Sequence, residues 1–260
     1  MIGVLDWGIG GLFAVECILR REPSVDLAFL SDAGSIPYGR QQRPQLRHSV
    51  QRAVDHLRTL GASQILVACH SASTVLPELA LPGVHGVICP AHIPPSRRIL
   101  VLGGVRTIRS GAWRRALHHH GTVVQRIAQP LSAAVESGLI DHPATRQSLH
   151  RILAPARDAD TVVLACTHYI ALAPQIHALM PQATIIDPAL AEVGKLDIPA
   201  GSGLRIAQTT GDVHRTREVV TRLLPSVATQ LRFEGWSEPP LAASPPSDPR
   251  RRRPGRNRGT

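Results

Sequence analysis

Two short apolar runs in the chain end in the same dipeptide. Residues 65–68 (ILVA) and 162–165 (VVLA) are followed directly by Cys69 and Cys166, and small or polar residues come next. A run that is too short for a helix and apolar on both faces predicts a central strand of a parallel sheet. Because ligands bind at the carboxyl ends of such strands, where the next helix begins, both cysteines are expected at a ligand site.

The rest of the apolar pattern predicts alternating strands and helices. Further strands are expected over residues 2–5, 27–30, 84–88, 99–102 and 185–186, and helices over residues 12–21, 44–60, 132–139, 143–153 and 213–224. This alternation is typical of an α/β fold with parallel sheets. The strand at 99–102 and the Gly/Thr/Ser turn after it repeat the opening of the chain, so two similar halves are predicted, each with one thiol.

The paired cysteines indicate acid–base chemistry. A thiol near a helix N-terminus has a lowered pKa, and the thiolate is the useful base. Two thiols on opposite faces of one carbon can invert a stereocentre, because one removes a proton while the other delivers one. Asp6 and His168 are the strand-end groups that could tune them. A pyridoxal phosphate mechanism would need a Schiff-base lysine, and the single lysine, Lys195, has no partner motif, so no cofactor and no metal are expected.

Composition indicates a soluble globular protein. The chain has 260 residues, of which 43% are hydrophobic, and its mean hydropathy is near zero. No apolar run approaches the ~20 residues that cross a bilayer, and the first residues lack the pattern of a signal peptide. The four cysteines show no dense disulfide pattern, so a reducing, cytoplasmic location is expected. Cys17 and Cys89 are interpreted as ordinary small residues of the core.

The net charge of +10 comes in part from the C-terminal segment. Residues 235–260 are rich in proline, carry four consecutive arginines at 250–253, and hold little apolar content with which to fold. They are predicted to form a disordered basic tail. A charge run without interleaved aromatic residues is more often solvated than bound, so nucleic-acid contact through the tail is the weaker alternative.

The turn at residues 6–11 (DWGIGG) has two interpretations. A strand, a glycine turn and a helix suggest a dinucleotide site, but that motif would need a glycine at Phe13. We favour a turn whose glycines let the backbone approach a small anionic substrate, with Asp6 projecting into the site.

Adjacent histidines at 118–120 would point in different directions on a helix, and they are predicted to be a polar helix end rather than a metal site.

Five ordered motifs resemble those of glutamate racemases, in the aspartate/glutamate racemase superfamily. The motifs are DWGIGG at 6–11, IPYG at 36–39, ACHSAS at 68–73, VESG at 135–138 and ACTHY at 165–169. Weaker matches are TIRSG at 107–111 and TGD at 210–212. The resemblance extends from about residue 2 to residue 233. It implies a racemase that needs no pyridoxal phosphate and supplies D-glutamate for peptidoglycan.

The resemblance also implies an architecture. Two pseudo-symmetric α/β domains, each a parallel sheet flanked by helices, would hold the active site in the cleft between them. The expected first domain is 1–93 with 205–234, and the expected second domain is 94–204. An amino acid is the expected small-molecule partner, no membrane partner is expected, and a homodimer stays open beside a monomer.

Roles for individual residues follow from the same resemblance. The implied catalytic residues are Cys69, Cys166, Asp6, His168 and Glu136, with Asp6 beside Cys69, and Glu136 and His168 beside Cys166. The implied substrate-binding positions are Trp7, Pro37, Tyr38, Gly39, His70, Ser71, Thr107 and Thr167.

The chain departs from the family pattern at Trp7 and His70. Family members usually carry a serine and an asparagine there, and both side chains hold the substrate. Ser71 can replace the usual threonine hydroxyl. Either Tyr38 and Thr107 compensate for the two changes, or the substrate is a different amino acid.

Two other function classes stay open. Thiolates and imidazoles are zinc ligands, so Cys69, His70, Cys166 and His168 could belong to a metal hydrolase. A non-catalytic relative that binds an amino acid, with Trp7 filling its pocket, is the other alternative. A third interpretation treats the two cysteines as ordinary small residues of the core. It does not explain two Ala-Cys strand ends with acid–base partners, so the racemase hypothesis is preferred.

Overall fold

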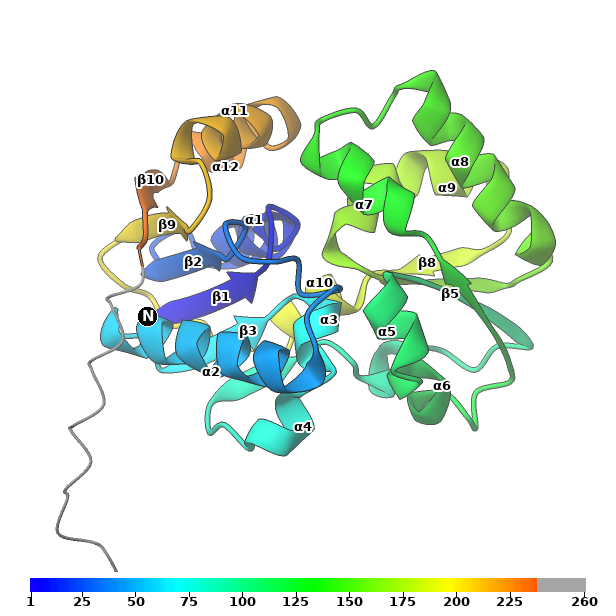
Figure 1. The fold of residues 1–260 in the computed structure, drawn as a ribbon, viewed down its shortest axis with the longest axis horizontal. Coiled ribbons are helices and arrows are strands. Elements are labelled where there is room, and N and C mark those ends of the chain that lie inside the picture. Colours follow the sequence, from blue (N-terminus) through cyan, green and yellow to red (C-terminus); the bar gives the residue numbers. More distant parts are fainter. Residues whose placement is uncertain (238–260) are drawn as a thin grey trace, which may run out of the picture.

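The strands form two parallel sheets, one in each half of the molecule (Figure 1). The computed structural model describes residues 1–237, so the predicted basic tail lies outside it from residue 238 onward. The predicted start of the tail at 235 falls inside the fold, since the last strand includes Gly235 and the Trp236 ring stacks on His56 with ring centroids 4.2 Å apart. No helix of the described part is long and apolar enough to span a bilayer.

The first sheet has six strands in the order β10-β9-β2-β1-β3-β4. Its strands are β1 (Ile2–Asp6), β2 (Leu27–Ser31), β3 (Gln64–Val67), β4 (Val84–Gly86), β9 (Arg205–Thr209) and β10 (Arg232–Gly235). One face packs against α1 (Leu12–Arg21), α10 (Pro188–Val193), α11 (Val213–Leu223) and α12 (Pro225–Ala228). The other face packs against α2 (Arg43–Thr59), α3 (His70–Ser73) and α4 (Leu76–Leu79).

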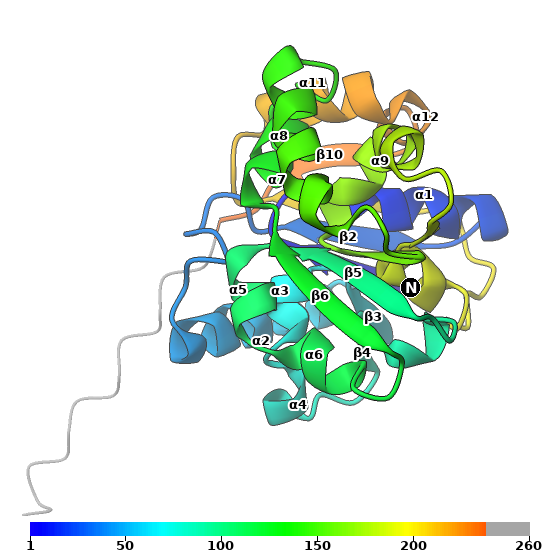
Figure 2. The same ribbon diagram turned by 90° about the vertical axis from the view of Figure 1, so that its right-hand side faces the viewer.

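The second sheet has four strands in the order β6-β5-β7-β8. Its strands are β5 (Arg98–Gly103), β6 (Thr122–Ile127), β7 (Thr161–Ala165) and β8 (Thr184–Ile186). Its two faces are covered by α7 (Gln129–Glu136), α8 (Pro143–Leu153) and α9 (Ala173–Leu179) on one side and by α5 (Val105–Arg109) and α6 (Ala112–Ala116) on the other (Figure 2). Short 3₁₀ turns are η1 (Pro90–His92), η2 (Ala154–Ala156) and η3 (Thr167–Leu172).

The two sheets repeat one topology. The order β2-β1-β3-β4 in the first matches β6-β5-β7-β8 in the second, and β9 and β10 extend only the first. In both, the strand order reverses beside the first strand of the half, which is where open α/β sheets bind ligands. Cys69 follows β3 by two residues and Cys166 directly follows β7, so the thiols occupy equivalent positions. The predicted fold class, two parallel sheets flanked by helices, is confirmed.

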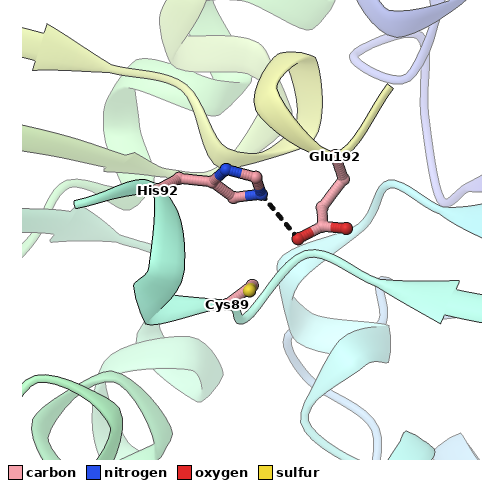
Figure 3. Close-up of side chains that lie close together, drawn as sticks. All are labelled: Cys89, His92 and Glu192. Carbon is pink, nitrogen blue, oxygen red and sulfur yellow. Dashed lines mark hydrogen bonds and ion pairs between the residues drawn. The ribbon is translucent and has the colours of Figure 1, made fainter. Parts of the chain in front are cut away.

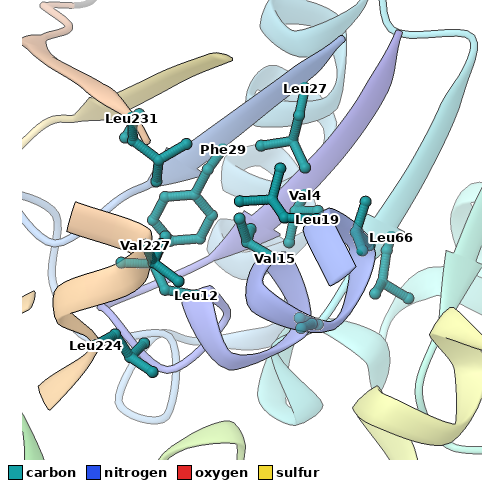
Figure 4. Packing of buried hydrophobic residues seen from close by; sticks show 14 of the residues in the cluster. Val4, Leu12, Val15, Leu19, Leu27, Phe29, Leu66, Leu224, Val227 and Leu231 are labelled. Carbon is teal, nitrogen blue, oxygen red and sulfur yellow. The ribbon is translucent and has the colours of Figure 1, made fainter. Parts of the chain in front are cut away.

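The core explains why the strands are apolar along their whole length. All five residues of β1, β2 and β7 are buried, because helices cover both faces of each sheet. Figure 4 shows Val4 and Phe29 of the first sheet packed against Leu12 of α1 and Val227 of α12. Each fully buried side chain of this size contributes about 1.5–3 kcal/mol to stability.

Two sequence predictions were imprecise. Strand β6 was not predicted, because it is a partly exposed edge strand with mixed polar and apolar residues. The helix expected over 132–139 covers Gln129–Glu136 instead. Pro130 stands in its first turn, where proline is favoured, and Gly138 follows its end with a φ of +66°.

Candidate active site

One cavity of about 890 Å³ lies between the two halves and is lined by residues from both. It is lined by every residue that the sequence analysis named as catalytic or substrate-binding: Cys69, Cys166, Asp6, His168, Glu136, Trp7, Pro37, Tyr38, Gly39, His70, Ser71, Thr107 and Thr167. The structure therefore brings together thirteen positions that the sequence spreads over more than 160 residues. A position in the lining does not by itself assign a role to a residue. The contacts of each side chain are therefore described in turn.

The cysteines reach the cavity from equivalent strand ends. Cys69 is the residue before α3 and Cys166 the residue before η3, and both have extended backbone conformations. Both thiols are free. Cys69 is buried and Cys166 is half-buried, so a small molecule in the cavity can meet a sulfur from either half.

Asp6 stands beside Cys69 at the end of β1 and is 1% exposed. Its carboxylate accepts hydrogen bonds from the Trp7 backbone N–H and from the Thr167 hydroxyl, both at 2.7 Å. Burial raises the pKa of Asp6, and the charge of His168 opposes only part of that rise. Burial, and then the negative charge of Asp6, raises the pKa of the Cys69 thiol well above its ordinary value. Cys69 is therefore a protonated thiol at neutral pH.

The partners of Cys166 have the opposite character. His168 Nδ1 lies 3.5 Å from Cys166 Sγ, and His168 Nε2 lies 2.5 Å from Glu136 Oε1. Burial alone lowers the pKa of His168, but the charges of Glu136 and Cys166 outweigh it and raise that pKa well above its ordinary value. The cavity thus has a buried thiol beside the Asp6 carboxylate on one side, and a thiol beside the His168–Glu136 pair on the other.

The two thiols also influence each other. A negative charge on Cys166 would contribute to the raised pKa of Cys69, so the two sulfurs lie close enough to interact electrostatically. With one sulfur ionised, the other is held more firmly in its protonated form.

Gly8 and Gly10, in the turn at residues 6–11, lie against the second half. A Cβ at Gly8 would overlap the Glu136 carboxylate, and a Cβ at Gly10 would overlap the Thr167 side chain. The Ile9 backbone N–H between them donates a 2.8 Å hydrogen bond to Glu136 Oε1. These glycines let the first half approach Glu136 and Thr167 of the second half. Trp7 and Ile9 of the same turn line the cavity, and the approach of this backbone to the substrate stays a prediction.

Tyr38 makes its hydrogen bond and its packing contacts within the first half. Its hydroxyl donates to Asp32 Oδ2 at 2.9 Å, and the same carboxylate accepts hydrogen bonds from Arg52 and Thr210. The phenol is 1% exposed, and its ring packs in the core against α2. Tyr38 also lines the cavity, so its expected part in substrate binding stays a prediction, while its hydroxyl proton is donated to Asp32.

His70 is the unusual side chain of the lining. It is 2% exposed, and neither ring nitrogen has a hydrogen-bond partner among residues 1–237. Its ring lies against the Trp113 ring, with centroids 6.1 Å apart. Burial lowers the pKa of His70 to about 3, so the imidazole is neutral at physiological pH. It can therefore offer the cavity one N–H donor and one nitrogen acceptor.

Trp7, Ser71, Thr107, Pro37 and Gly39 also line the cavity. The Trp7 indole N–H donates to the Ser35 carbonyl at 3.1 Å, so the ring is held in place beside the cavity. Ser71 Oγ and Thr107 Oγ1 lie 3.4 Å apart and come from different halves. Both hydroxyls, like Pro37 and Gly39 in the loop before α2, remain available to a ligand.

Sequence reasoning missed several polar residues of the lining. They are Ser31, Arg40, Arg109, Gln129, Ser132, Ser137, Asp212, Arg215 and Thr216. Arg109 belongs to the TIRSG match, and Arg215 follows the TGD match by three positions. These two weak motifs could therefore have indicated that both arginines lie at the site. Gln129 and Ser132 belong to α7, whose predicted start at 132 was three residues too late.

The metal-hydrolase alternative lacks geometric support. Among residues 1–237, Cys69, His70, Cys166 and His168 do not form a group of converging donor atoms. The His168 ring nitrogens face Glu136 and Cys166, while the His70 ring lies against Trp113.

These observations define a class of protein: a duplicated α/β fold that presents two cysteines, each with its own acid–base partners, to one cavity between the halves. No family model matches the chain. Glutamate racemase from Ectopseudomonas mendocina is 30% identical over 247 residues, which cover 86% of this chain and 94% of that protein. Glutamate racemase from Shouchella clausii is 34% identical over 200 residues, which cover 71% of this chain and 72% of that protein.

Solved structures give the same answer. A glutamate racemase isoform from Bacillus anthracis superposes with a TM-score of 0.81 at 29% identity, covering 91% of this chain and 97% of that one. Glutamate racemase from Thermus thermophilus, in complex with beta-chloro-D-alanine, has a TM-score of 0.78 at 28% identity, covering 91% and 96%. The chain belongs to the glutamate racemase family.

Proposed function

We propose that this protein interconverts L- and D-glutamate with Cys69 and Cys166 as the two acid–base groups. The observation that carries the proposal is the pair of free thiols at equivalent strand ends, facing one cavity, with different partners. Family membership supports glutamate as the substrate. The proposed site lies between a first domain of residues 1–93 with 205–234 and a second domain of residues 94–204, except that α10 and Leu196 pack in the core of the first sheet and belong with the first domain.

We propose that the first step begins at Cys166, whose sulfur lies 3.5 Å from His168 Nδ1. Acting as a thiolate, Cys166 removes the α-proton and becomes a thiol. The Cys69 thiol delivers its proton to the opposite face of the same carbon and becomes a thiolate, with its negative charge beside Asp6. One proton is removed and one is delivered, so the product is the other enantiomer. The enzyme then holds the reverse protonation pattern, in which it is ready for the opposite reaction.

The lining includes three arginines, Arg40, Arg109 and Arg215, beside the carboxylates of Asp6, Glu136 and Asp212. Guanidinium groups bind carboxylates well, so we propose the arginines as partners of the substrate carboxylates. Ser71 and Thr107 add hydroxyls, and the neutral His70 adds a donor and an acceptor that have no partner in the described chain. We propose that these groups, with Trp7, Pro37, Gly39 and Thr167, hold the substrate in this chain.

Polarimetry or circular dichroism with the purified protein tests the proposal. L-glutamate and D-glutamate should each proceed to an equal mixture, and Cys69→Ser and Cys166→Ser should each lower kcat by at least ~10²–10⁴-fold, the usual contribution of a general acid or base. Faster turnover of aspartate than of glutamate would reassign the substrate. Binding of glutamate without racemisation would reject the enzyme in favour of a binding relative.

Two further features remain proposals. D-glutamate made here would supply peptidoglycan synthesis in the cytoplasm, as implied by the family. A homodimer is tested by sedimentation of the full chain, in which a mass twice that of the 28.0 kDa protomer would support it.

A further inference from the structure

Two connections join the halves, and they meet at one cluster of polar side chains. The first connection passes from Val87, in the core of the first half, to Ile93, in the core of the second. The second passes from Ile186 in the second half to Ala189 in the first. Cys89 and His92 lie between Val87 and Ile93 on the first connection, and Glu192 lies in α10, three residues after Ala189 at the end of the second (Figure 3).

The three side chains converge. Their donor atoms, one thiol sulfur, one imidazole nitrogen and one carboxylate oxygen, all lie within 4.8 Å of one another. His92 Nε2 lies 2.7 Å from Glu192 Oε1. Glu192 is 6% exposed, and Cys89 and His92 are half-buried. Within residues 1–237 this is the one group of three such residues with converging donor atoms.

A cation of the protein already occupies this position. Lys195 Nζ lies 3.4 Å from Cys89 Sγ and 3.3 Å from Glu192 Oε1. The cluster thus attracts positive charge through the same two atoms that would bind a metal. The Lys195 side chain is half exposed, so it can turn into solvent without disturbing the core.

We propose that Cys89, His92 and Glu192 bind one Zn²⁺ ion, which displaces the Lys195 ammonium group. A thiolate, an imidazole and a carboxylate with a water as the fourth ligand form a tetrahedral zinc site, whereas Mg²⁺ and Ca²⁺ prefer oxygen ligands alone. Binding releases the Cys89 thiol proton to solvent, because the metal ligand is the thiolate. The site is separate from the cavity of the two catalytic thiols, whose lining does not include these residues.

The position of the site gives the ion a defined effect. Helix α10 carries Glu192 and packs against both α1 of the first half and β7 of the second. A metal bound by Glu192 of α10 and by Cys89 and His92 would cross-link the two segments in which the chain passes between the halves. Bound Zn²⁺ should therefore raise the melting temperature, and racemisation does not require it.

Co²⁺ titration of the full chain tests the proposal, in a background with Cys69→Ser and Cys166→Ser so that the catalytic thiols do not bind the metal. Co²⁺ in a four-coordinate thiolate site gives a thiolate-to-cobalt charge-transfer band and strong visible bands. We expect one Co²⁺ per chain, displaced by one equivalent of Zn²⁺. Absence of these bands, or their persistence after Cys89→Ala, would overturn the proposal.

Three variants separate the site from adventitious binding. Glu192→Gln removes a ligand and should weaken Zn²⁺ binding by more than the ~10–100-fold that loss of an outer partner costs. Lys195→Met removes the competing cation and should tighten binding, a gain that a misfolded variant does not produce. Cys17→Ala, at another half-buried free thiol, should leave binding unchanged. Equal affinity in wild type and Lys195→Met would contradict displacement of the ammonium group.

Discussion

Thr167 of the second half donates its hydroxyl to Asp6 of the first half at a distance of 2.7 Å. Thr167 directly follows Cys166, and Asp6 lies close enough to Cys69 to raise the pKa of that thiol, so one buried contact joins the two thiol-bearing strand ends. Both partners are at least 95% buried. The contact fixes how the acid–base groups of one half lie relative to those of the other.

Removal of this hydroxyl should affect both stability and turnover. Thr167→Val keeps the shape but takes one hydrogen bond from a buried carboxylate, so the pKa of Asp6 should rise further. We expect a loss of about 1–3 kcal/mol in the free energy of unfolding, measured in urea, and a lower kcat. Thr145→Val is the matched control, since that hydroxyl donates to the Leu139 carbonyl in the second half and does not line the cavity. An unchanged kcat in Thr167→Val would contradict the coupling.

Glu136 should control the alkaline limb of activity. Its carboxylate holds the pKa of His168 high, so Glu136→Gln should lower that pKa and move the alkaline limb of kcat/KM to lower pH by about one unit or more. In the wild type the pair stabilises the fold fully below the unfolded histidine pKa of ~6.5, and this stabilisation is lost as pH rises through the raised folded pKa. Glu218→Gln, on the exposed face of α11, should leave the profile in place. Identical profiles for wild type and Glu136→Gln would reject the assignment.

His70 should make the protein sensitive to acid. Its folded pKa of about 3 lies below the unfolded value, so the unfolded chain binds a proton that the folded chain excludes between these pH values. Stability should therefore fall as pH falls from ~6.5 toward 3, by up to ~1.4 kcal/mol per pH unit from this group. Denaturant unfolding of His70→Asn should show a shallower decline than wild type. The exposed His214→Asn should decline like wild type, and a wild-type slope in His70→Asn would contradict the prediction.

Tyr38 should matter for stability rather than for substrate affinity. Tyr38→Phe removes a buried hydrogen bond to Asp32 and should cost about 1–3 kcal/mol in unfolding free energy, with KM for glutamate within about twofold of wild type. Thr210→Val, which removes another donor to the same carboxylate, should also reduce stability. A large increase in KM with unchanged stability would restore the substrate role implied by the family resemblance.

The sequence predicted the placement of the cysteines because that placement depends on local pattern. Apolar runs that are buried on both faces identify central parallel strands, and the residues that follow them lie at one edge of the sheet. Cys69 and Cys166 were therefore assigned correctly to strand ends, and the repeated run indicated two similar halves, whereas the order of the strands came only from the structure. The edge strand β6 was missed because half of its surface faces solvent and its pattern is mixed.

The remaining features depend on contacts between distant segments. Nothing near Tyr38 in sequence indicates that Arg52 and Thr210 share its Asp32 partner. The close approach of Gly8 to Glu136 joins residues 128 positions apart. The cluster of Cys89 and Glu192 exists only because the two connections between the halves cross at one place. Such contacts are set by the packing of the halves and leave no periodic signal.

The most direct test of two thiols acting on one carbon is racemisation of L-glutamate in heavy water, followed by mass spectrometry of both enantiomers at early times. Each thiol exchanges with solvent before the reaction, so Cys69 should deliver deuterium while Cys166 removes protium. The account predicts that the first D-glutamate formed carries one deuterium at the α-carbon while the remaining L-glutamate stays protiated. Equal deuterium in both enantiomers, or protium retained in the product, would indicate a single base and contradict the account.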